Sequence, residues 1–380
     1  MTTIKPRISI CMSSYNHERF LRESIESVLN QTYSNFELII LDDASTDSSW
    51  EIIESFQDPR VIALRNNTNR ERRFNQIIPG LKGEFIAVHH SDDAWEPEKL
   101  QKQVDYLDAN PNTGAVFSLV NVVDSDGQPR LDGTHHYSRT FELENRNRFD
   151  WLRYFFFNGN GLCHPSVLIR KKCYEECGLY LPGLVQLPDF DMWVRLCLRY
   201  EIHVLQERLV RFRVLDDLTN SSSPRMENQI RLQFEYLQVY KNYLHLTNSG
   251  EFLQVFPEAV KYQDQDWFEP AYALAMMAME NSNIKPGQLF GLQLLFDLQN
   301  DPIKSEALKR HLGFDLNAYK KIAGEADVFY YRTQALLAET RAALAKCQQQ
   351  VQFYSQSRSW KLTAPLRKLV ALFHHSKIEE

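Results

Sequence analysis

Residues 36–47 read FELIILDDASTD, and they combine a strand pattern with a cluster of acidic side chains. The first six residues are apolar except for Glu37. A continuous apolar run of this length is typical of a strand that is buried on both faces, as in a parallel sheet covered by helices. The run ends at Asp42 and Asp43, which therefore follow the carboxyl end of the predicted strand. The polar residues after them suit a turn that leads into a helix.

The flanking sequence repeats this order of strand and helix. Short apolar runs predict further strands at residues 8–12, 61–64, 85–89 and 114–123. Apolar residues at helical spacing predict helices at residues 20–29, 50–56, 70–81 and 97–107, with Pro97 at the first helical position. Strands that alternate with helices over short connections form βαβ units. We therefore expect an α/β protein with a doubly wound, mostly parallel sheet.

Polar side chains follow three of the predicted strands. Residues 13–16 follow the first strand, Asp42 and Asp43 the second, and Asp92 and Asp93 the fourth. The carboxyl ends of parallel strands form the edge at which open α/β sheets bind ligands, so the three clusters should meet in one crevice. The sequence has no GxGxxG after a strand and no GxxxxGKS or GxxxxGKT. A dinucleotide enzyme and a P-loop nucleoside triphosphatase are therefore not expected.

Two acidic pairs in one crevice indicate a bound cation. Carboxylates repel a diphosphate unless a divalent cation lies between them, and oxygen ligands of this kind suit Mg²⁺ or Mn²⁺. One pair would hold a metal-bound diphosphate, and the other would accept hydrogen bonds from a base or a ribose. The alternative is structural, because Asp42, Asp43, Asp92 and Asp93 each stand shortly before a predicted helix that they could cap.

The sequence from Ile8 to Leu107 closely resembles family 2 glycosyltransferases, which have the GT-A fold. The matching pieces are SSYN at 13–16, SIESVLNQTY at 24–33, FELIILDDASTD at 36–47 and SDD at 91–93, the last of which looks like the DXD-type metal motif of the family. The resemblance extends over about the first 215 residues. Two positions depart from the family pattern: Ser13 stands where Thr or Pro-Thr is common, and Ser91 stands where many members have Asp.

On the nucleoside side, the resemblance implies a role for each matching residue. Ser13 and Tyr15 would line the nucleobase pocket, with the Tyr15 ring stacked on the base. Asp43 would accept a hydrogen bond from the base, typically a pyrimidine. Arg70 or a neighbouring arginine would lie near the nucleotide.

On the phosphate and sugar side, Asp92 would contact the ribose or the sugar, and Asp93 would ligate Mn²⁺ or Mg²⁺. The resemblance thus implies a nucleotide-sugar donor, such as a UDP-sugar or a dTDP-sugar. The acceptor would be a saccharide or a lipid-linked hydroxyl compound.

The acceptor half is expected to follow at residues 124–218. Residues 124–160 read as irregular, and residues 164–170 read as a strand that places His164 near the acceptor. Residues 186–196, QLPDFDMWVRL, resemble the acceptor-side helix of the family, in which an acidic residue serves as the catalytic base. Asp189 matches the base, and Asp191 matches a second acidic residue that binds substrate.

Pro188 stands where Glu is frequent in the family, so one member of the usual acidic pair is missing. Pro can begin a helix, and Asp189 would then project from the first turn, where capping of the helix is its alternative role. The resemblance implies a single in-line displacement with inversion. Such a displacement requires one carboxylate to accept the proton of the acceptor hydroxyl.

We divide the chain into a catalytic domain at 1–218, with a nucleotide-binding half at about 1–123 and an acceptor half at about 124–218, a polar linker at 219–224, a helical region at 225–325, a short coiled-coil pattern at 326–356, and a basic amphipathic tail at 357–380. In the coiled-coil pattern, Leu337, Leu344 and Val351 recur every seven residues, which is typical of a seam between helices and could join copies of the chain.

The tail carries an apolar stripe at Leu366, Leu369, Val370 and Phe373 beside basic residues, and it resembles tails of bacterial polysaccharide-assembly enzymes. We expect it to lie on the inner face of the plasma membrane, with docking on the helical region or on a partner subunit as the alternative. It is too short to span a bilayer.

The composition and the absence of certain sequence patterns exclude several classes of protein. The chain has 380 residues, 43% of them apolar, and a net charge of −6, so disordered and collagen-like classes are excluded and a general nucleic-acid binder is not expected. No apolar run of about 18 residues and no signal-peptide pattern occur, so a cytoplasmic enzyme is expected. The six cysteines form no CxxC pair and are expected to be reduced, buried thiols. The rival functions are a sugar nucleotidyltransferase and an inactive transferase-like scaffold of a polysaccharide-assembly complex.

Overall fold

The computed structural model describes residues 5–67, 74–130, 136–215, 225–281 and 284–367. The chain forms two compact units, Met1–Lys320 and Lys321–Glu380. The predicted linker at 219–224 and the end of the tail from residue 368 lie outside the described residues.

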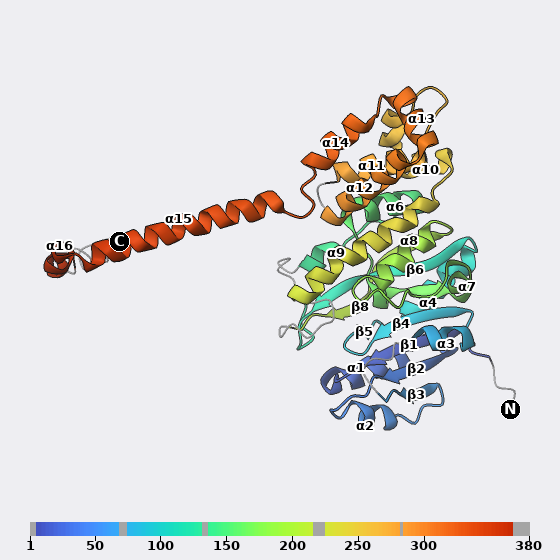
Figure 1. Ribbon diagram of the computed structural model, residues 1–380. Helices are drawn as coiled ribbons and strands as arrows, with labels where there is room; N and C mark the ends of the chain where they lie inside the picture. Colours follow the sequence, from blue (N-terminus) through green and yellow to red (C-terminus); the bar gives the residue numbers. More distant parts are fainter. Residues whose placement is uncertain (1–4, 68–73, 131–135, 216–224, 282–283, 368–380) are drawn as a thin grey trace. The chain divides into compact units, whose positions relative to one another are not determined.

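One eight-stranded sheet forms the basis of the first unit (Figure 1). Its strands are β1 (Ile8–Ser14), β2 (Phe36–Asp42), β3 (Val61–Arg65), β4 (Phe85–His90), β5 (Ala94–Trp95), β6 (Thr113–Val123), β7 (Leu168–Arg170) and β8 (Glu201–Arg213). They lie in the order β3-β2-β1-β4-β7-β6-β8-β5. Strands β3, β2, β1 and β4 are parallel neighbours, as are β6 and β8, whereas β7 and β5 run antiparallel to the strands beside them. The predicted α/β fold with a mostly parallel sheet is confirmed.

Helices connect and cover these strands. Up to residue 200 they are α1 (Glu18–Leu29), α2 (Ser49–Glu54), α3 (Phe74–Ile77), η1 (Ile78–Gly80), α4 (Lys99–Ala109), α5 (His136–Thr140), α6 (Arg148–Asn158), η2 (His164–Ser166), α7 (Lys171–Cys177) and α8 (Pro188–Cys197). Helix α1 buries Leu21, Ile25 and Val28, which share one face because they are spaced by four and three residues. All seven residues of β2 are buried, as its apolar run predicts.

Two segments fold differently from the sequence-based expectation. The predicted strand at 164–170 is a 3₁₀ turn, η2, followed by the three-residue β7, because Pro165 has no N–H for a strand ladder. Residues 124–160, expected to be irregular, contain α5 and α6, and the Asn147 side chain caps α6 by accepting hydrogen bonds from the Phe149 and Asp150 N–H groups.

Two of the predicted helices have other bounds among the described residues. The predicted helix at 70–81 is described only from Phe74, as α3 and η1, and residues 68–73, including Arg70, lie outside the described residues. Helix α4 begins at Lys99 rather than at Pro97, since Glu98 occupies the N-cap position.

The described residues beyond 224 are mostly helical, as predicted. In the first unit they form α9 (Met226–Tyr240), η3 (Lys241–His245), α10 (Ser249–Val255), η4 (Pro257–Tyr262), α11 (Pro270–Glu280), α12 (Lys285–Asn300) and α13 (Pro302–Leu312), followed by α14 (Leu316–Glu325). The second unit contains α15 (Tyr331–Gln356) and α16 (Arg358–Leu362). Among the described residues, no helix is both long enough and apolar enough to cross a membrane.

The cysteines follow the expectation only in part. All six are free thiols, and Cys11, Cys163, Cys173 and Cys197 are buried. The expectation of burial is wrong for Cys347, which is exposed on α15. The heptad residues of α15 are exposed as well, and their pairing with another helix stays a prediction.

Candidate active site

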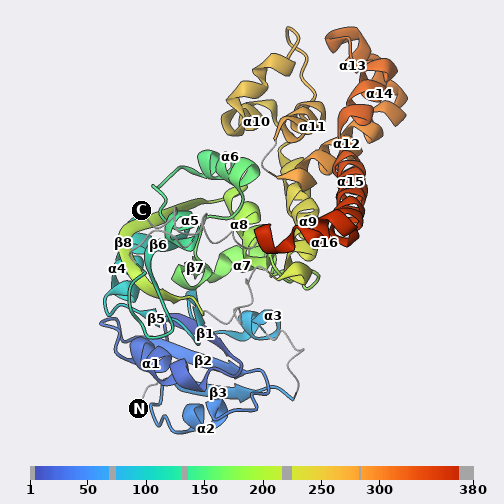
Figure 2. The same cartoon turned by 90° about the vertical axis from the view of Figure 1, so that its left-hand side faces the viewer.

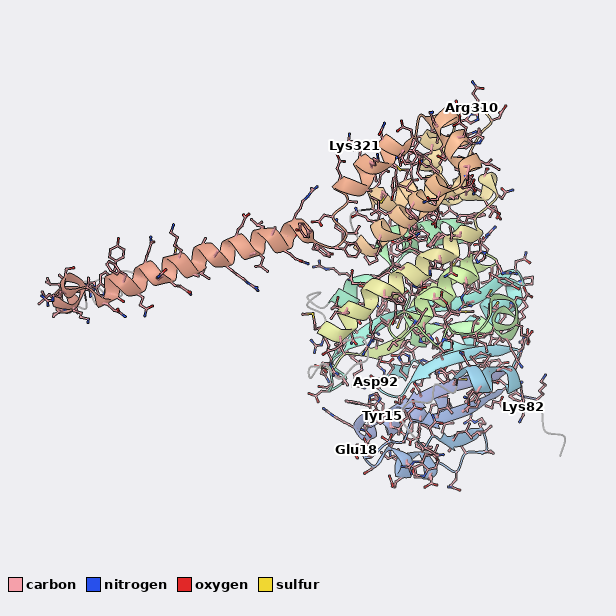
Figure 3. All side chains as sticks on the ribbon, in the orientation of Figure 1. Tyr15, Glu18, Lys82, Asp92, Arg310 and Lys321 are labelled. Atoms are coloured by element: carbon pink, nitrogen blue, oxygen red, sulfur yellow. The ribbon has the colours of Figure 1, made fainter. Side chains whose placement is uncertain are left out.

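The strand ends that carry the polar clusters lie side by side. Ser13 of β1 is in register with Leu41 of β2 and with His90 of β4, and Ser14 is in register with Asp42. The loops that follow these strands therefore start at one edge of the sheet. Figure 3 shows Tyr15 and Asp92 at this edge and Lys82 at the opposite end of the strands.

The loops after β1 and β2 are joined by hydrogen bonds. The Asp43 N–H donates to the Ser14 carbonyl at 2.8 Å, and the Asn16 N–H donates to Ser45 Oγ at 3.0 Å. Asn16 and Ala44 have φ angles of 52° and 60°, in the left-handed region that Asn tolerates and Ala rarely adopts. The contacts on both sides hold this strained turn in place.

The two acidic residues after β2 have different environments. Asp42 is completely buried, and its Oδ2 accepts a hydrogen bond from the Ser45 N–H at 3.0 Å. Asp43 is only partly buried, and its Oδ1 accepts a hydrogen bond from Asn66 Nδ2 at 2.5 Å. The exposed fraction of Tyr15 is 40%. Asp43 and Tyr15 can therefore contact a ligand, whereas Asp42 maintains the turn.

After β4, three side chains form a group that could hold a metal ion. One ligand atom each from His90, Asp92 and Asp93 lie within 4.8 Å of one another. Asp93 Oδ1 accepts a hydrogen bond from the Arg213 N–H at 2.8 Å, while Asp93 Oδ2 is buried and has no hydrogen-bond partner among the described residues. Burial, and then the charge of Asp92, raise the pKa of Asp93 well above its usual value. A buried carboxylate oxygen that accepts no hydrogen bond and lies 3.6 Å from His90 Nδ1 fits a divalent cation, as do two carboxylates beside an imidazole.

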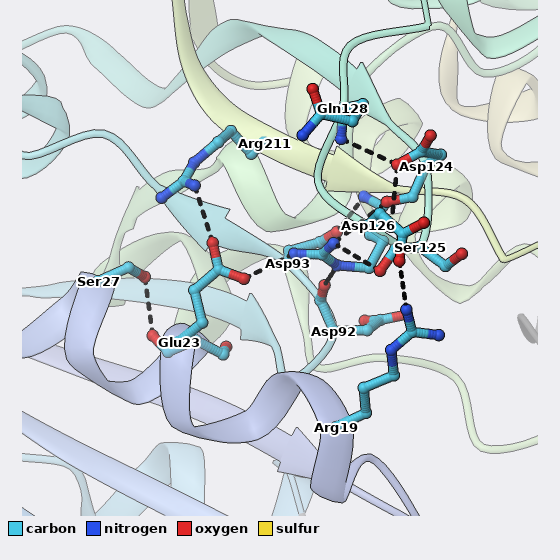
Figure 4. Close-up of polar contacts among 12 residues, drawn as sticks. Arg19, Glu23, Ser27, Asp92, Asp93, Asp124, Ser125, Asp126, Gln128 and Arg211 are labelled. Carbon is cyan, nitrogen blue, oxygen red and sulfur yellow. Dashed lines mark hydrogen bonds and ion pairs between the residues drawn. The ribbon is translucent and has the colours of Figure 1, made fainter.

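Arg213, at the end of β8, donates hydrogen bonds to the acidic loop that follows β4. Its Nε donates to the Asp92 carbonyl at 2.8 Å, and its two terminal nitrogens contact the Asp124 carbonyl at 3.1 Å and Glu23 Oε2 at 2.8 Å. Figure 4 shows Glu23 and Asp124 on either side of the acidic pair. The guanidinium thus connects the loops after β4 and β6 with helix α1.

On the acceptor side, Asp189 is the second residue of α8, which begins at Pro188 as predicted. The Asp189 side chain is partly buried, and its Oδ2 accepts a hydrogen bond from Asn160 Nδ2 at 3.0 Å. Burial raises the pKa of Asp189 to about 6, against the opposing effects of the Phe190 N–H and of Asn160. A carboxylate with this pKa is suited to take up a proton near neutral pH.

Asp191 has a different environment one half-turn further along α8. It is completely buried, and its Oδ2 lies 2.8 Å from a terminal nitrogen of Arg195. Its Oδ1 accepts a hydrogen bond from Asn242 Nδ2 at 2.8 Å. Both oxygens of Asp191 are therefore bonded to the protein itself.

His164 brings the acceptor side close to the metal group. Its ring meets the His90 ring edge to face, with 5.4 Å between the centroids, and its Nε2 lies 3.0 Å from the Tyr180 hydroxyl. Burial lowers the pKa of His164 to about 3, so the imidazole is neutral near pH 7.

The Cys163 thiol, next to His164, has its pKa raised by burial and then by the charges of Asp93 and Asp189.

The structure thus brings the predicted residues Ser13, Tyr15, Asp43, Asp92 and Asp93 to one edge of the sheet. It places the His164 ring against the His90 ring and Asp189 in the first turn of α8. Asp191 lies in an internal ion pair, and Arg70 is outside the described residues. Sequence reasoning missed His90, Asn160, Asn66 and Arg213. The sequence does offer a signal for His90, because histidine is a common metal ligand and it directly precedes the SDD motif at 91–93. Arg213 carried no such signal, because β8 also contains Glu201, Glu207, Arg208 and Arg211.

The mixed, mostly parallel sheet, with an acidic group at the strand ends and a carboxyl group at a helix start, agrees with the GT-A fold that the sequence resemblance implies. Residues 9–178 match the family model described as "Glycosyl transferase family 2". TuaG of Bacillus subtilis, whose name assigns it provisionally to teichuronic acid biosynthesis, is 31% identical over 267 residues, which are 69% of this chain and 99% of TuaG. The chain therefore belongs to family 2 of the glycosyltransferases.

Two further proteins are similar to this chain. The UDP-Glc:alpha-D-GlcNAc-diphosphoundecaprenol beta-1,3-glucosyltransferase WfaP of Escherichia coli is 37% identical over 103 residues, which are 27% of this chain and 41% of WfaP. The crystal structure of residues 1–349 of Staphylococcus aureus TarS in complex with UDP matches with a TM-score of 0.52 and 15% identity, over 86% of this chain and 92% of that chain. The comparisons do not favour a nucleotidyltransferase or an inactive scaffold.

Proposed function

We propose that this enzyme transfers a sugar from a nucleotide-sugar donor to a hydroxyl group of a saccharide or lipid-linked acceptor, with inversion at the anomeric carbon and with dependence on Mn²⁺ or Mg²⁺. The observation that supports this proposal best is the group of His90, Asp92 and Asp93 at the strand ends, which could hold a metal ion and whose His90 ring contacts the His164 ring of the acceptor side. Asp93 has a buried oxygen without a hydrogen-bond partner, and Asp189 has a pKa near neutrality.

On the donor side, the exposed ring of Tyr15 would stack on the nucleobase, with Ser13 lining the pocket and Asp43 accepting a hydrogen bond from the base. Asp92 would contact the ribose or the sugar. Asp93 would ligate the cation together with His90. When bound, a divalent cation supplies positive charge near the diphosphate that leaves with the nucleotide.

On the acceptor side, Asp189 would act as the general base. The acceptor oxygen would form a bond to the anomeric carbon as the bond from that carbon to the diphosphate oxygen breaks. The hydroxyl proton would pass to Asp189, so one base suffices and no covalent intermediate is required. We assign Asp191 a positioning role, because Arg195 and Asn242 occupy its oxygens.

The relatives support a choice of donor and acceptor. TarS was solved with UDP, and the name of WfaP specifies a UDP-sugar and a diphosphoundecaprenol acceptor. We therefore favour a UDP-sugar over a dTDP-sugar, and a lipid-linked acceptor in the assembly of a cell-envelope polysaccharide. The proposed division into a donor half at 1–123 and an acceptor half at 124–218 follows the positions of Asp93 and Asp189.

A lipid-linked acceptor would favour attachment of the enzyme to the inner face of the plasma membrane. Arg358, Lys361 and Arg367 provide positive charge, and the Arg367 guanidinium stacks on the Trp360 ring at 3.7 Å from its centroid. We propose that this basic segment binds an anionic membrane surface, and that α15 pairs with a second copy of the chain through its heptad residues.

A screen of UDP- and dTDP-sugars against polyprenyl-diphosphate saccharides tests the proposed function. Release of nucleotide diphosphate should require Mn²⁺ or Mg²⁺ and stop with EDTA, and NMR of the first product should show the anomeric configuration opposite to that of the donor. Transfer that continues undiminished in EDTA, or that retains the donor configuration, would contradict the proposal.

A further inference from the structure

A buried glutamate of the C-terminal helical region binds the segment that precedes the proposed base. Glu235 lies on α9 with 2% of its surface exposed. Its Oε1 accepts a hydrogen bond from the Val185 N–H at 2.8 Å, and its Oε2 accepts hydrogen bonds from the N–H groups of Gln186 and Leu187 at 2.7 Å and 2.8 Å. One carboxylate therefore binds three consecutive backbone amides, 48 to 50 residues away in the sequence.

These three amides lead directly into α8. Leu187 is the N-cap residue of this helix, and its apolar side chain provides no capping hydrogen bond. Asp189 is two residues further on. Hydrogen bonds to an ionised acceptor are stronger than those between neutral groups, and a buried amide that loses its partner costs about 1–3 kcal/mol. Without Glu235, residues 185–187 would rearrange, and they would carry Asp189 with them.

Helix α9 also contacts residue 186 and the loop that contains Gly159 and Asn160. Gln186 Nε2 donates to Asn228 Oδ1 at 3.1 Å. A Cβ added to Gly159 would lie 2.7 Å from the Tyr236 hydroxyl, so α9 closely approaches the loop that carries Asn160, the hydrogen-bond partner of Asp189. Figures 1 and 2 both show α9 lying alongside α8.

We propose that Glu235 is a positioning residue for sugar transfer: by binding the amides of residues 185–187, it fixes the start of α8 and so sets Asp189 against the acceptor hydroxyl. This inference rests on the proposed function, in which Asp189 is the base. It makes the first helix of the C-terminal region a part of the acceptor site rather than a separate module.

Amide hydrogen exchange and kinetics of the full chain together test this proposal. In Glu235→Gln, a neutral group replaces the carboxylate at nearly constant volume. We expect exchange of residues 185–190 to accelerate at least tenfold, kcat to fall at least tenfold, and the affinity for UDP with Mn²⁺ to change less than twofold. Glu235→Asp retains a carboxylate and tests the same contact if Glu235→Gln does not fold.

Asp301→Asn provides a matched control. Asp301 also accepts hydrogen bonds from backbone amides, those of Ile303 and Lys304 at 3.0 Å, but it caps α13. This variant should change neither the exchange at 185–190 nor kcat. A purely structural role of Glu235 would lower the overall stability and leave kcat of the folded fraction unchanged.

The possible results separate the two proposals. Unchanged exchange at 185–190 in both Glu235 variants would overturn the anchoring role, and faster exchange with an unchanged kcat would overturn the positioning role. A wild-type enzyme that transfers no sugar would contradict the proposed function itself, and the exchange data would still decide whether Glu235 anchors the segment.

Discussion

Removal of the Asn160 amide should shift the pH dependence of transfer in a defined direction. Asn160 Nδ2 donates to Asp189 Oδ2 at 3.0 Å and so stabilises the ionised form of the carboxyl group, whose pKa is about 6. A hydrogen bond to a charged group contributes about 1.5–3 kcal/mol, and one pKa unit corresponds to about 1.4 kcal/mol. In Asn160→Ala, the pKa of Asp189 should therefore rise by about 1–2 units, to about 7–8.

The assay is kcat as a function of pH between about 5 and 9, with donor and acceptor saturating. A general base works in its deprotonated form, so kcat falls as the pH drops through its pKa. The acid limb should lie near pH 6 in the wild type and about 1–2 units higher in Asn160→Ala, with most of the activity restored at pH 9. Asn158→Ala is the matched control, because Asn158 Nδ2 donates to the Tyr154 carbonyl at 3.1 Å. An acid limb of Asn160→Ala that coincides with the wild-type limb or lies below it would refute this reasoning.

Three further predictions concern the metal loop, the core and the tail. Arg213→Lys retains the charge but loses the planar fork, so urea denaturation should show a loss of about 1–3 kcal/mol and half-maximal activity should need more Mn²⁺; unchanged values for both would be contrary to the role of Arg213. Burial lowers the pKa of Lys99 well below its usual value, so the unfolded chain holds this proton more tightly than the native state does, and wild-type stability should rise with pH, by at most about 1.4 kcal/mol per pH unit, in the range between the native and the unfolded pKa. Lys99→Met should lack this contribution, and equal slopes for the two proteins would exclude it. A chain ending at Gln356 should lose binding to anionic vesicles at low salt, and equal binding of the full and shortened chains would rule out the tail as the anchor.

Much of the fold could be predicted because its signals are local. The apolar run at 36–41 is buried along its whole length, and the polar residues after β1, β2 and β4 lie in register because parallel strands end at one edge. Pro188 begins α8 and sets Asp189 in its first turn, which the φ preference of proline makes predictable.

The contacts that hold the site together could not be predicted in the same way. Arg213 contacts the Asp92 carbonyl across 121 residues of sequence, and Glu235 contacts Leu187 across 48. No sequence pattern indicates either contact, because the partner in each is a backbone group, which every residue type provides. The environment of Asp191 could not be predicted either, because Asn242 of the distant turn η3 donates a hydrogen bond to it.

Binding and transfer, measured in parallel for Asp93→Asn and Asp189→Asn, test the central proposal most directly. UDP binding is measured by calorimetry with and without Mn²⁺, and sugar transfer is measured with the best donor of the screen. We predict that Asp93→Asn loses the Mn²⁺-dependent part of UDP binding, whereas Asp189→Asn keeps it and loses about 10²–10⁴-fold in kcat. Transfer by Asp189→Asn at the wild-type rate, or Mn²⁺-dependent binding that survives in Asp93→Asn, would contradict the assignment of base and metal ligand.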